Sequence, residues 1–314
     1  MDRKRYLEGL AFGASAFVLW GLLPLYWKMV SAISPFQIFA QRVVWSFLFV
    51  CLLLAARKNW AEFADILKDR REWLRIAGPA LLIAMNWCTY IWAVNNGYVI
   101  EASLGYYINP LILTFLGWVF FKERLNPLQK VSIAFAAAGV GIKTVLYGRF
   151  PLVAIVLAVS FALYGLLKKK SRLNSVSGLG FETLVIGIPS LLYLVFHEAR
   201  GSGITGNLPW TFWLLIALSG AITAVPLIFY AEGTKRLPLT IIGFLQYLSP
   251  TIQLFLGIFV FREHFDSASL LAFSPIWAGV VLFTYSQYAM LRGGEYGPGH
   301  AAAADESLPR CDVK

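Results

Sequence analysis

Two ionisable residues lie well inside long apolar segments of this 314-residue sequence. Arg42 interrupts the segment FAQRVVWSFLFV (39–50), and Glu182 interrupts GLGFETLVIGIP (178–189). A charge at the centre of a membrane helix costs about 2.5–3.5 kcal/mol, and such residues are usually retained for a function. An arginine there can hold an anionic group, and a glutamate can hold a cationic group or a proton. Both residues are therefore candidates for a functional site.

Three arrangements would explain this pair of charges. The two side chains could form a structural ion pair that locks two helices together. They could instead form a substrate site, in which Arg42 holds an anionic group and Glu182 holds a cationic group or a proton. In the third arrangement, Arg42 reaches the membrane surface along its flexible stem.

The composition places these residues in an integral membrane protein. Hydrophobic residues make up 58% of the chain and charged residues only 14%, whereas soluble domains are near half apolar and a quarter charged. A spanning helix needs about 20 apolar residues. The sequence predicts ten such helices, at 8–30, 35–56, 74–97, 102–121, 127–147, 151–168, 176–196, 209–232, 238–261 and 267–290.

Lysines and arginines gather in alternate loops, for example in DRKR (2–5), KERLNPLQK (122–130) and LKKKSR (167–172). This distribution is typical of cytoplasmic loops and predicts that both termini are cytoplasmic. It also accounts for the net charge of +10 without a nucleic-acid surface, on which the charge would be concentrated.

With this topology Arg42 lies roughly 10 Å from the outer end of its helix and Glu182 roughly 9 Å from the inner end of its own. The loop at 57–73 is predicted to hold a short helix on the membrane surface.

The second half of the sequence repeats the first. YINPLILTFLGWVFFKE (107–123) matches YLSPTIQLFLGIFVFRE (247–263) at a shift of 140 residues, and the same shift carries Arg42 onto Glu182. FVLWGLL (17–23) matches FALYGLL (161–167) at a shift of 144 residues. Because each half holds an odd number of helices, the second half enters the membrane from the other side. The predicted fold is all-α, with two inverted five-helix repeats at 1–147 and 151–290 and a disordered cytoplasmic tail at 291–314.

Polar and aromatic residues inside the predicted helices complete the candidate site. Prolines follow Asn109 and Ser249, and each proline removes a backbone hydrogen bond, so helix breaks are predicted at Pro110 and Pro250. Breaks at matching positions of two repeats are typical of transport sites. Besides Arg42 and Glu182, the predicted substrate-binding residues are Asn86, Tyr106, Tyr107, Gln246, Tyr247, Trp20 and Tyr164. Packing in the core is the alternative role for each aromatic residue.

No catalytic or metal-binding pattern accompanies these residues. His197, His264 and His300 fall in predicted loops or the tail, and the three cysteines are far apart in the sequence. We therefore expect no catalytic residue, cofactor or metal. The alternatives to transport are a membrane-embedded enzyme and a non-transporting sensor or assembly protein. An enzyme predicts turnover that depends on a nucleophile, whereas a transporter predicts flux that depends on Arg42 or Glu182.

Several long motifs resemble one known family. WGLLPLYWK (20–28), EASLGYYINPL (101–111), GFETLVIGIP (180–189) and GFLQYLSPT (243–251) are similar to the RarD group of the EamA family, in the drug/metabolite transporter superfamily. The resemblance covers about residues 6–288. It implies a ten-helix protein of the bacterial inner membrane that transports a small metabolite or drug, more commonly by export. The family name is associated with chloramphenicol sensitivity, which is a phenotype and not a substrate.

Gln41 departs from the histidine that the resemblance leads us to expect beside Arg42, so proton coupling through a histidine at that position is not available.

We expect alternating access, with the two halves rocking about a central cavity between helices one to four and six to nine. Helices five and ten, which are rich in small residues, are expected to pack as a scaffold or as the face of a homodimer. The expected partners are a small-molecule substrate and the lipid bilayer, with no nucleic acid.

Overall fold

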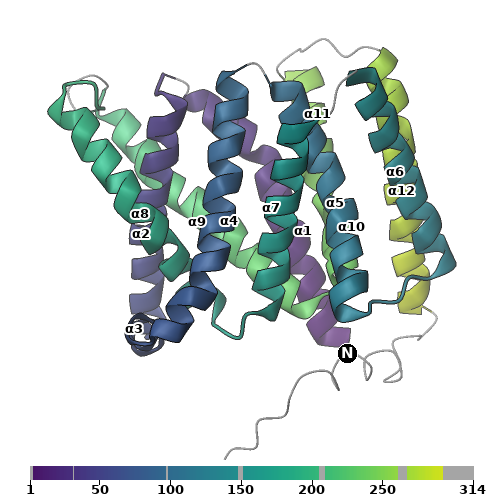
Figure 1. Ribbon diagram of the computed structural model, residues 1–314, viewed down its shortest axis with the longest axis horizontal. Coiled ribbons are helices and arrows are strands. Elements are labelled where there is room, and N and C mark those ends of the chain that lie inside the picture. Colours follow the sequence, from purple (N-terminus) through teal and green to yellow (C-terminus); the bar gives the residue numbers. More distant parts are fainter. Residues whose placement is uncertain are drawn as a thin grey trace, which may run out of the picture.

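The computed structural model describes residues 3–30, 32–96, 98–147, 151–204, 209–260 and 267–292. This part of the chain is helical and contains no strand. The tail at 291–314, for which disorder is predicted, lies outside the described residues beyond position 292. The helices, labelled in Figure 1, are α1 (Arg3–Met29), α2 (Pro35–Ala56), α3 (Trp60–Lys68), α4 (Arg70–Asn95), α5 (Val99–Phe121), α6 (Pro127–Tyr147), α7 (Leu152–Lys170), α8 (Ser175–Ala199), α9 (Thr211–Arg236), α10 (Leu239–Gln246), α11 (Leu248–Phe255), the π-helical segment η1 (Leu256–Val260) and α12 (Ser267–Arg292).

The all-helical membrane fold predicted from the sequence is confirmed. Among the described residues, nine helical segments are long and apolar enough to cross a membrane, with α10, α11 and η1 counted together. The tenth predicted range, 267–290, lies on α12. The short helix predicted in the loop at 57–73 is α3.

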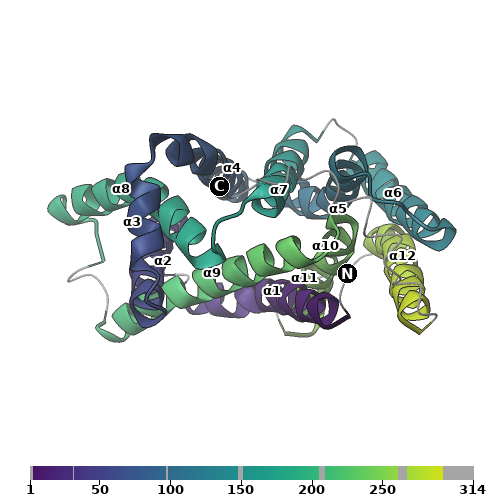
Figure 2. The same ribbon diagram turned by 90° about the horizontal axis from the view of Figure 1, so that it is seen from below.

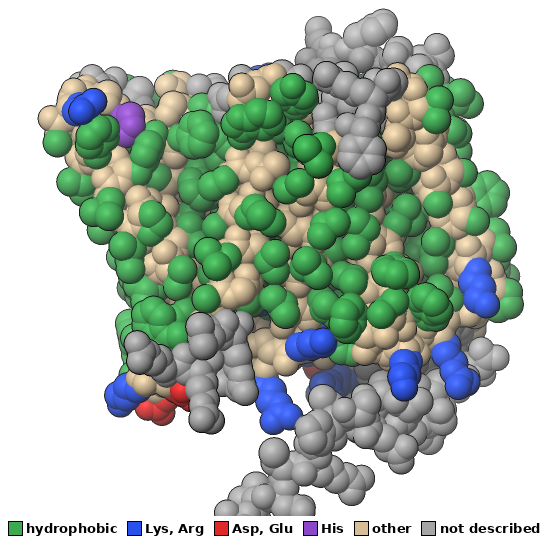
Figure 3. Space-filling view, viewed as in Figure 1, with side chains coloured by type: hydrophobic (Ala, Val, Ile, Leu, Met, Phe, Trp, Pro, Cys, Tyr) green, Lys and Arg blue, Asp and Glu red, His purple; other side chains and the backbone are tan. Residues whose placement is uncertain are grey.

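Charged side chains lie at the ends of this bundle. Figure 3 shows hydrophobic side chains over the middle of the molecule and lysines and arginines near the edge where the N-terminus of α1 lies. We call this edge the basic end and the other edge the opposite end. A broad apolar belt with charges at its margin is what a bilayer requires of the protein surface.

Contacts between the two halves of the chain come in matching pairs. α1 packs on α9 and α7 packs on α4; α2 packs on α9 and α8 packs on α4; α5 packs on α7 and α1 packs on α11. The sequence shifts relate α1 to α7, α2 to α8, α4 to α9, α5 to α10 and α11, and α6 to α12. When each helix is replaced by the one related to it, the first contact of each pair becomes the second. Three further contacts join equivalent helices directly, namely α2 with α8, α5 with α10, and α6 with α12.

Two glycines allow the helices of different halves to approach closely. A Cβ added at Gly220 would lie 2.3 Å from the backbone oxygen of Trp45, which is too close for any side chain. A Cβ at Gly279 would lie 2.7 Å from the backbone oxygen of Ser132. Small residues at such crossings bring helix backbones into van der Waals contact. Figure 2 shows the α6–α12 pair side by side at one end of the molecule.

The two prolines with predicted helix breaks behave differently. α10 ends at Gln246, and the chain turns at Tyr247 before α11 begins. Pro250 lacks the N–H that would bond to the carbonyl of Gln246, which lowers the cost of this turn. α5 instead continues through Pro110, in contrast to the break predicted there. Because α5 is packed along both α7 and α10, the loss of one backbone bond leaves its course unchanged.

Candidate functional site

A cavity of about 480 Å³ lies between the two halves. Its walls come from helices of both halves, and it reaches Trp27 and Ile33 beside the turn between α1 and α2, at the opposite end of the bundle. Six polar side chains contribute to its lining, namely Arg42, Asn86, Thr223, Gln246, Ser249 and Gln253. Eight aromatic side chains also line it, namely Phe17, Trp20, Trp27, Phe39, Trp87, Tyr90, Tyr106 and Phe161.

Among the described residues, the Arg42 guanidinium contacts aromatic rings and no carboxylate. Its guanidinium carbon lies 4.1 Å from the ring centre of Trp87, 5.6 Å from that of Phe39 and 5.7 Å from that of Trp27. These are cation–π distances, which stabilise the charge without neutralising it. The Nε atom is buried and has no hydrogen-bond partner among the described residues. The guanidinium is therefore positioned with at least one donor left for a ligand.

Two buried polar atoms of other lining residues are also without partners in the described part of the chain. They are Oε1 of Gln246 and Oγ1 of Thr223, and both residues line the cavity. A buried polar atom that lacks a hydrogen bond typically costs about 1–3 kcal/mol. Three such atoms belong to residues that line this cavity, which makes it the candidate binding site.

Asn86 also lines the cavity, but its amide is used in packing. Its Nδ2 donates to the carbonyl of Leu157 at 2.8 Å and to Oγ of Ser160 at 2.9 Å. These bonds fix α4 against α7. The donors of Asn86 are thus occupied, whereas the acceptor of Gln246 is not.

Glu182 does not line the cavity and does not pair with Arg42 in this structure. Its Oε1 lies 2.8 Å from Nζ of Lys168, and its Oε2 accepts a hydrogen bond from the hydroxyl of Tyr164 at 3.1 Å. The side chains of Lys168 and Glu182 are only 5% and 3% exposed. Lys168 was not among the predicted site residues because it belongs to a basic run at the end of a predicted helix. Its spacing of one helical turn from Tyr164 is the signal that indicates a shared face.

An aromatic cluster connects the cavity with Glu182. Trp20 and Phe161 line the cavity and lie 5.8 Å apart between ring centres. Tyr230 lies 5.6 Å from Trp20 and stacks on Tyr164 at 6.0 Å. Tyr164 and Tyr230 are fully buried. They fill the space that separates the Arg42 cavity from the buried ion pair.

The remaining predicted tyrosines divide between the cavity and the core. Tyr106 lines the cavity. Tyr107 and Tyr247 lie outside its lining and stack at 6.4 Å, with the hydroxyl of Tyr247 donating to the carbonyl of Tyr107 at 3.2 Å. The shift of 140 residues in the sequence relates these two residues, and their contact fixes α5 against the turn between α10 and α11. Of the two prolines, Pro250 lines the cavity and Pro110 does not.

The basic end of the bundle is tied together by a further set of polar contacts. Glu123 follows α5 and accepts bonds from the backbone N–H groups of Leu239 and Thr240, at 2.7 and 3.0 Å, and from Oγ1 of Thr240 at 2.7 Å. Lys169 lies 3.5 Å from the Glu123 carboxylate. The carboxylate therefore caps the N-terminus of α10, where it also interacts favourably with the helix dipole. These contacts join the first half of the chain to the second.

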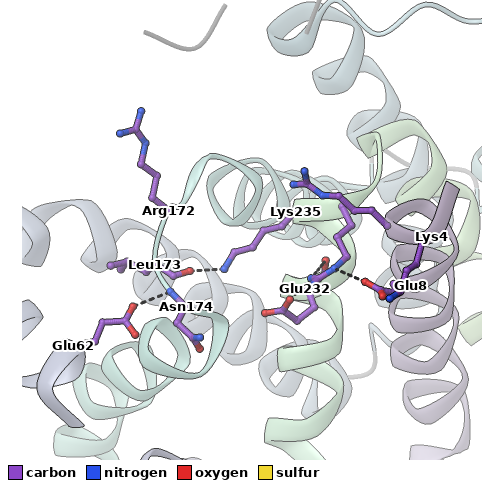
Figure 4. A pocket seen from close by; sticks show the side chains of 10 residues that line it. Lys4, Glu8, Glu62, Arg172, Leu173, Asn174, Glu232 and Lys235 are labelled. Atoms are coloured by element: carbon purple, nitrogen blue, oxygen red, sulfur yellow. Dashed lines mark hydrogen bonds and ion pairs between the residues drawn. The ribbon is translucent and has the colours of Figure 1, made fainter. Parts of the chain in front are cut away.

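A wide charged pocket of about 770 Å³ lies at the same end, between the starts of α1 and α8 and the end of α9. Figure 4 shows that its charged groups mostly contact protein partners. Glu62 accepts from the backbone of Asn174, Lys235 donates to the carbonyl of Leu173, and Arg236 bonds to Glu232. The described residues contain no group of three or more histidine, cysteine or acidic side chains suited to a metal ion.

Comparisons with known proteins give the same family twice along the chain. The model of the EamA-like transporter family matches residues 7–144 and again residues 150–285. Over 94% of its length the chain is 45% identical to uncharacterized transporter YojE of Bacillus subtilis (strain 168), of which 99% is covered. It is 38% identical to Protein RarD of Streptomyces exfoliatus over 88% of each protein. A solved crystal structure that is 20% identical covers 88% of this chain and 97% of its own, with a TM-score of 0.69, and so has the same fold.

Proposed function

Because this chain belongs to the EamA-like transporter family, we propose that it exports a small metabolite or drug by alternating access, with the Arg42 cavity as the substrate site. The chain is a multi-pass protein of the bacterial inner membrane. The observation that carries the proposal is the cavity itself, since it lies between the two halves and is lined by a positive side chain and by two further residues, Thr223 and Gln246, that each hold a buried polar atom without a partner among the described residues. Alternating-access transporters bind substrate at such an interface, near the middle of the membrane.

The second part of the proposal is that the halves are inverted repeats which exchange roles. Three observations support it: the family model matches twice, the contacts between halves come in matching pairs, and Tyr107 meets its equivalent Tyr247 directly. The two cytoplasmic termini and the ten spanning helices belong to the same proposal.

The present conformation is assigned as outward-facing. The cavity reaches the turn between α1 and α2, which lies away from the basic end. At the basic end, which we assign to the cytoplasm, the way from the cavity is filled by the Tyr164–Tyr230 stack and the Lys168–Glu182 pair. The contacts of Glu123 tie the two halves there. An inward-facing state would break these contacts and close the space around Arg42.

Alternating access predicts opposite changes at the two ends of the bundle. We would replace all three native cysteines by alanine and introduce either Ile38→Cys, in the cavity lining, or Gly178→Cys. A Cβ at Gly178 would lie 3.7 Å from Nζ of Lys168 without a clash. Labelling of the single introduced thiol with a membrane-impermeant maleimide is measured in vesicles of known orientation. Adding Lys168→Gln and Glu182→Gln should raise labelling of the Gly178→Cys protein from the cytoplasmic side and lower labelling of the Ile38→Cys protein from the outside. Parallel changes in both proteins, or no change, contradict the mechanism.

Export is tested with cells that express the wild type, Arg42→Gln or Arg200→Gln. Arg200 is an exposed arginine outside the cavity and serves as the control. The small molecules in the medium are compared by mass spectrometry at equal expression. A compound that accumulates with the wild type and the control but not with Arg42→Gln supports export through this site. Export through this site is contradicted if the compound accumulates equally with all three proteins. It is also contradicted if the compound accumulates to the same level with cells that express none of them. No described feature favours a membrane enzyme or a sensor over this function.

A further inference from the structure

We infer that the cavity selects a monoanion, in which one carboxylate-type group is attached to a flat apolar body that also carries a hydrogen-bond donor. This inference rests on the proposed function and narrows its substrate class. It follows from the charges of the cavity, the side chains around Arg42, and the polar atoms that the protein leaves without partners.

The charge balance of the cavity is set by Arg42 alone. Among the described residues that line the cavity, Arg42 is the one that carries a charge at neutral pH. Glu182 cannot balance it, because its carboxylate is bonded to Lys168 and Tyr164 on the other side of the aromatic cluster. A single positive charge in an apolar, partly enclosed space attracts an anion and repels a cation. A neutral ligand would leave the arginine without a counter-charge after water is displaced.

The repeat explains why this charge is left uncompensated. A shift of 140 residues relates Arg42 to Glu182, and the shift of 144 residues in the first helix of each half relates Pro24 to Lys168. The second half therefore supplies a counter-ion for its own buried charge. In the first half a proline stands at that position and lines the cavity. No carboxylate is among the described residues that line the cavity, and we assign the counter-ion of Arg42 to the substrate.

The aromatic rings determine the shape of the rest of the ligand. Trp27, Phe39 and Trp87 present ring faces around the guanidinium, at 4.1–5.7 Å. Tyr90 and Tyr106 continue this surface. Their rings lie 5.9 Å apart between centres. A flat apolar body can stack on such rings while its anionic group contacts the arginine. The volume of about 480 Å³ lies within the usual range for small-molecule sites.

The unpartnered atoms assign the polar groups of the ligand. Nε of Arg42 is a donor and matches a carboxylate oxygen. Oε1 of Gln246 is an acceptor and matches an N–H or O–H on the apolar body. The amide of Asn86 cannot replace Arg42 as the donor, because its Nδ2 is bonded to Leu157 and Ser160. Gln246 is therefore proposed as a specificity-determining residue.

The test is binding of matched probes to the purified full-length protein, followed by isothermal titration calorimetry and by the thermal unfolding midpoint. The probes are benzoate, 2-naphthoate and anthracene-2-carboxylate, each with its neutral amide and its cationic methylamine. At least one acid should bind, and its amide and amine should bind about 30-fold or more weakly, as expected when a buried charge loses its partner. Failure of all three acids, or equal binding of an amide or amine, overturns the inference.

Variants separate the site from the fold. Arg42→Gln should abolish binding of the acid, Arg42→Lys should retain part of it, and the control Arg200→Gln should leave it unchanged. 6-Hydroxy-2-naphthoate should bind more tightly than 2-naphthoate to the wild type, and Gln246→Leu should remove that difference. Size-exclusion chromatography and circular dichroism verify that each variant is folded. Unchanged binding of the acid by folded Arg42→Gln overturns the assignment.

The inference and the proposed function can fail separately. If cells export a neutral or cationic compound in an Arg42-dependent manner while no acid binds, the substrate class is wrong and the export function stands. If the acids bind as described but expression changes nothing in the medium and labelling shows no opposite changes, the anion site stands and the transport function is wrong.

Discussion

Lys168 and Glu182 form a buried ion pair at 2.8 Å, and both belong to the second half of the chain. Arg42 is the residue that the 140-residue shift relates to Glu182. Its guanidinium carbon lies 4.1 Å from the ring centre of Trp87 instead of beside a carboxylate of the described residues. Two equivalent positions thus carry opposite charges with different kinds of partner. One is neutralised inside the protein, and the other faces a cavity.

The ion pair predicts a large loss of stability when only its lysine is removed. Lys168→Met leaves the Glu182 carboxylate buried without a counter-charge, which typically costs about 3–5 kcal/mol. The thermal unfolding midpoint in detergent should fall clearly. The double variant with Glu182→Gln should recover most of the loss. Lys170→Met is the control, because Lys170 is exposed on the same helix. A loss no larger than that of the control would show that the pair does not stabilise the fold.

Removal of the Glu123 side chain should loosen the start of α10. Its carboxylate accepts three hydrogen bonds from Leu239 and Thr240, and loss of such a cap typically costs about 0.5–2 kcal/mol. Glu123→Ala should therefore accelerate hydrogen exchange of the backbone amides at 239–241. Glu8→Ala provides a control at the same end of the bundle, since Glu8 is exposed. Exchange rates that match those of the control would argue against the cap.

The crossing of α2 and α9 should not tolerate a larger residue than glycine. A Cβ at Gly220 would overlap the backbone of Trp45 at 2.3 Å, so Gly220→Ala must move one helix. Overpacking of this kind costs about 1–3 kcal/mol. The yield of folded protein and its unfolding midpoint should both fall. Gly187→Ala is the matched control, because a Cβ there would meet nothing within 4 Å. Equal effects of the two substitutions would mean that the close approach is not required.

Trp87 should contribute to the affinity of the cavity for anions through its contact with Arg42. Trp87→Leu removes the nearest ring face, and cation–π contacts contribute about 0.5–2 kcal/mol. A loose guanidinium is a poorer partner for a carboxylate, so binding of 2-naphthoate should weaken by about 2-fold to 30-fold. Trp118→Leu is the control, since Trp118 is exposed on α5. The contrast is measured by calorimetry, and unchanged affinity in Trp87→Leu would exclude a role for this ring.

Much of the site was predictable because its elements are marked locally. Arg42 and Gln246 stand out as polar residues in apolar segments, and both line the cavity. Trp20, Asn86, Tyr106 and Pro250 were predicted on similar grounds and line it as well. Tyr107, Tyr164 and Tyr247 carry the same local signal, yet the structure places them in the core. A tyrosine deep in a helix has the same sequence appearance whether its helix face meets a cavity or another helix.

The sequence alone determined the helical membrane fold, because the length of an apolar segment and the position of its flanking charges are properties of consecutive residues. It also predicted the repeat, since a fixed shift can be read directly from the amino-acid sequence. Only the tertiary structure decided that Glu182 meets Lys168, that Arg42 meets aromatic rings, and that α5 continues through Pro110. Such contacts depend on how each helix is rotated and which helix it packs against. The rotation and the packing partner of each helix are determined by the fit of many side chains across the two halves. They cannot be read from any single segment of the chain.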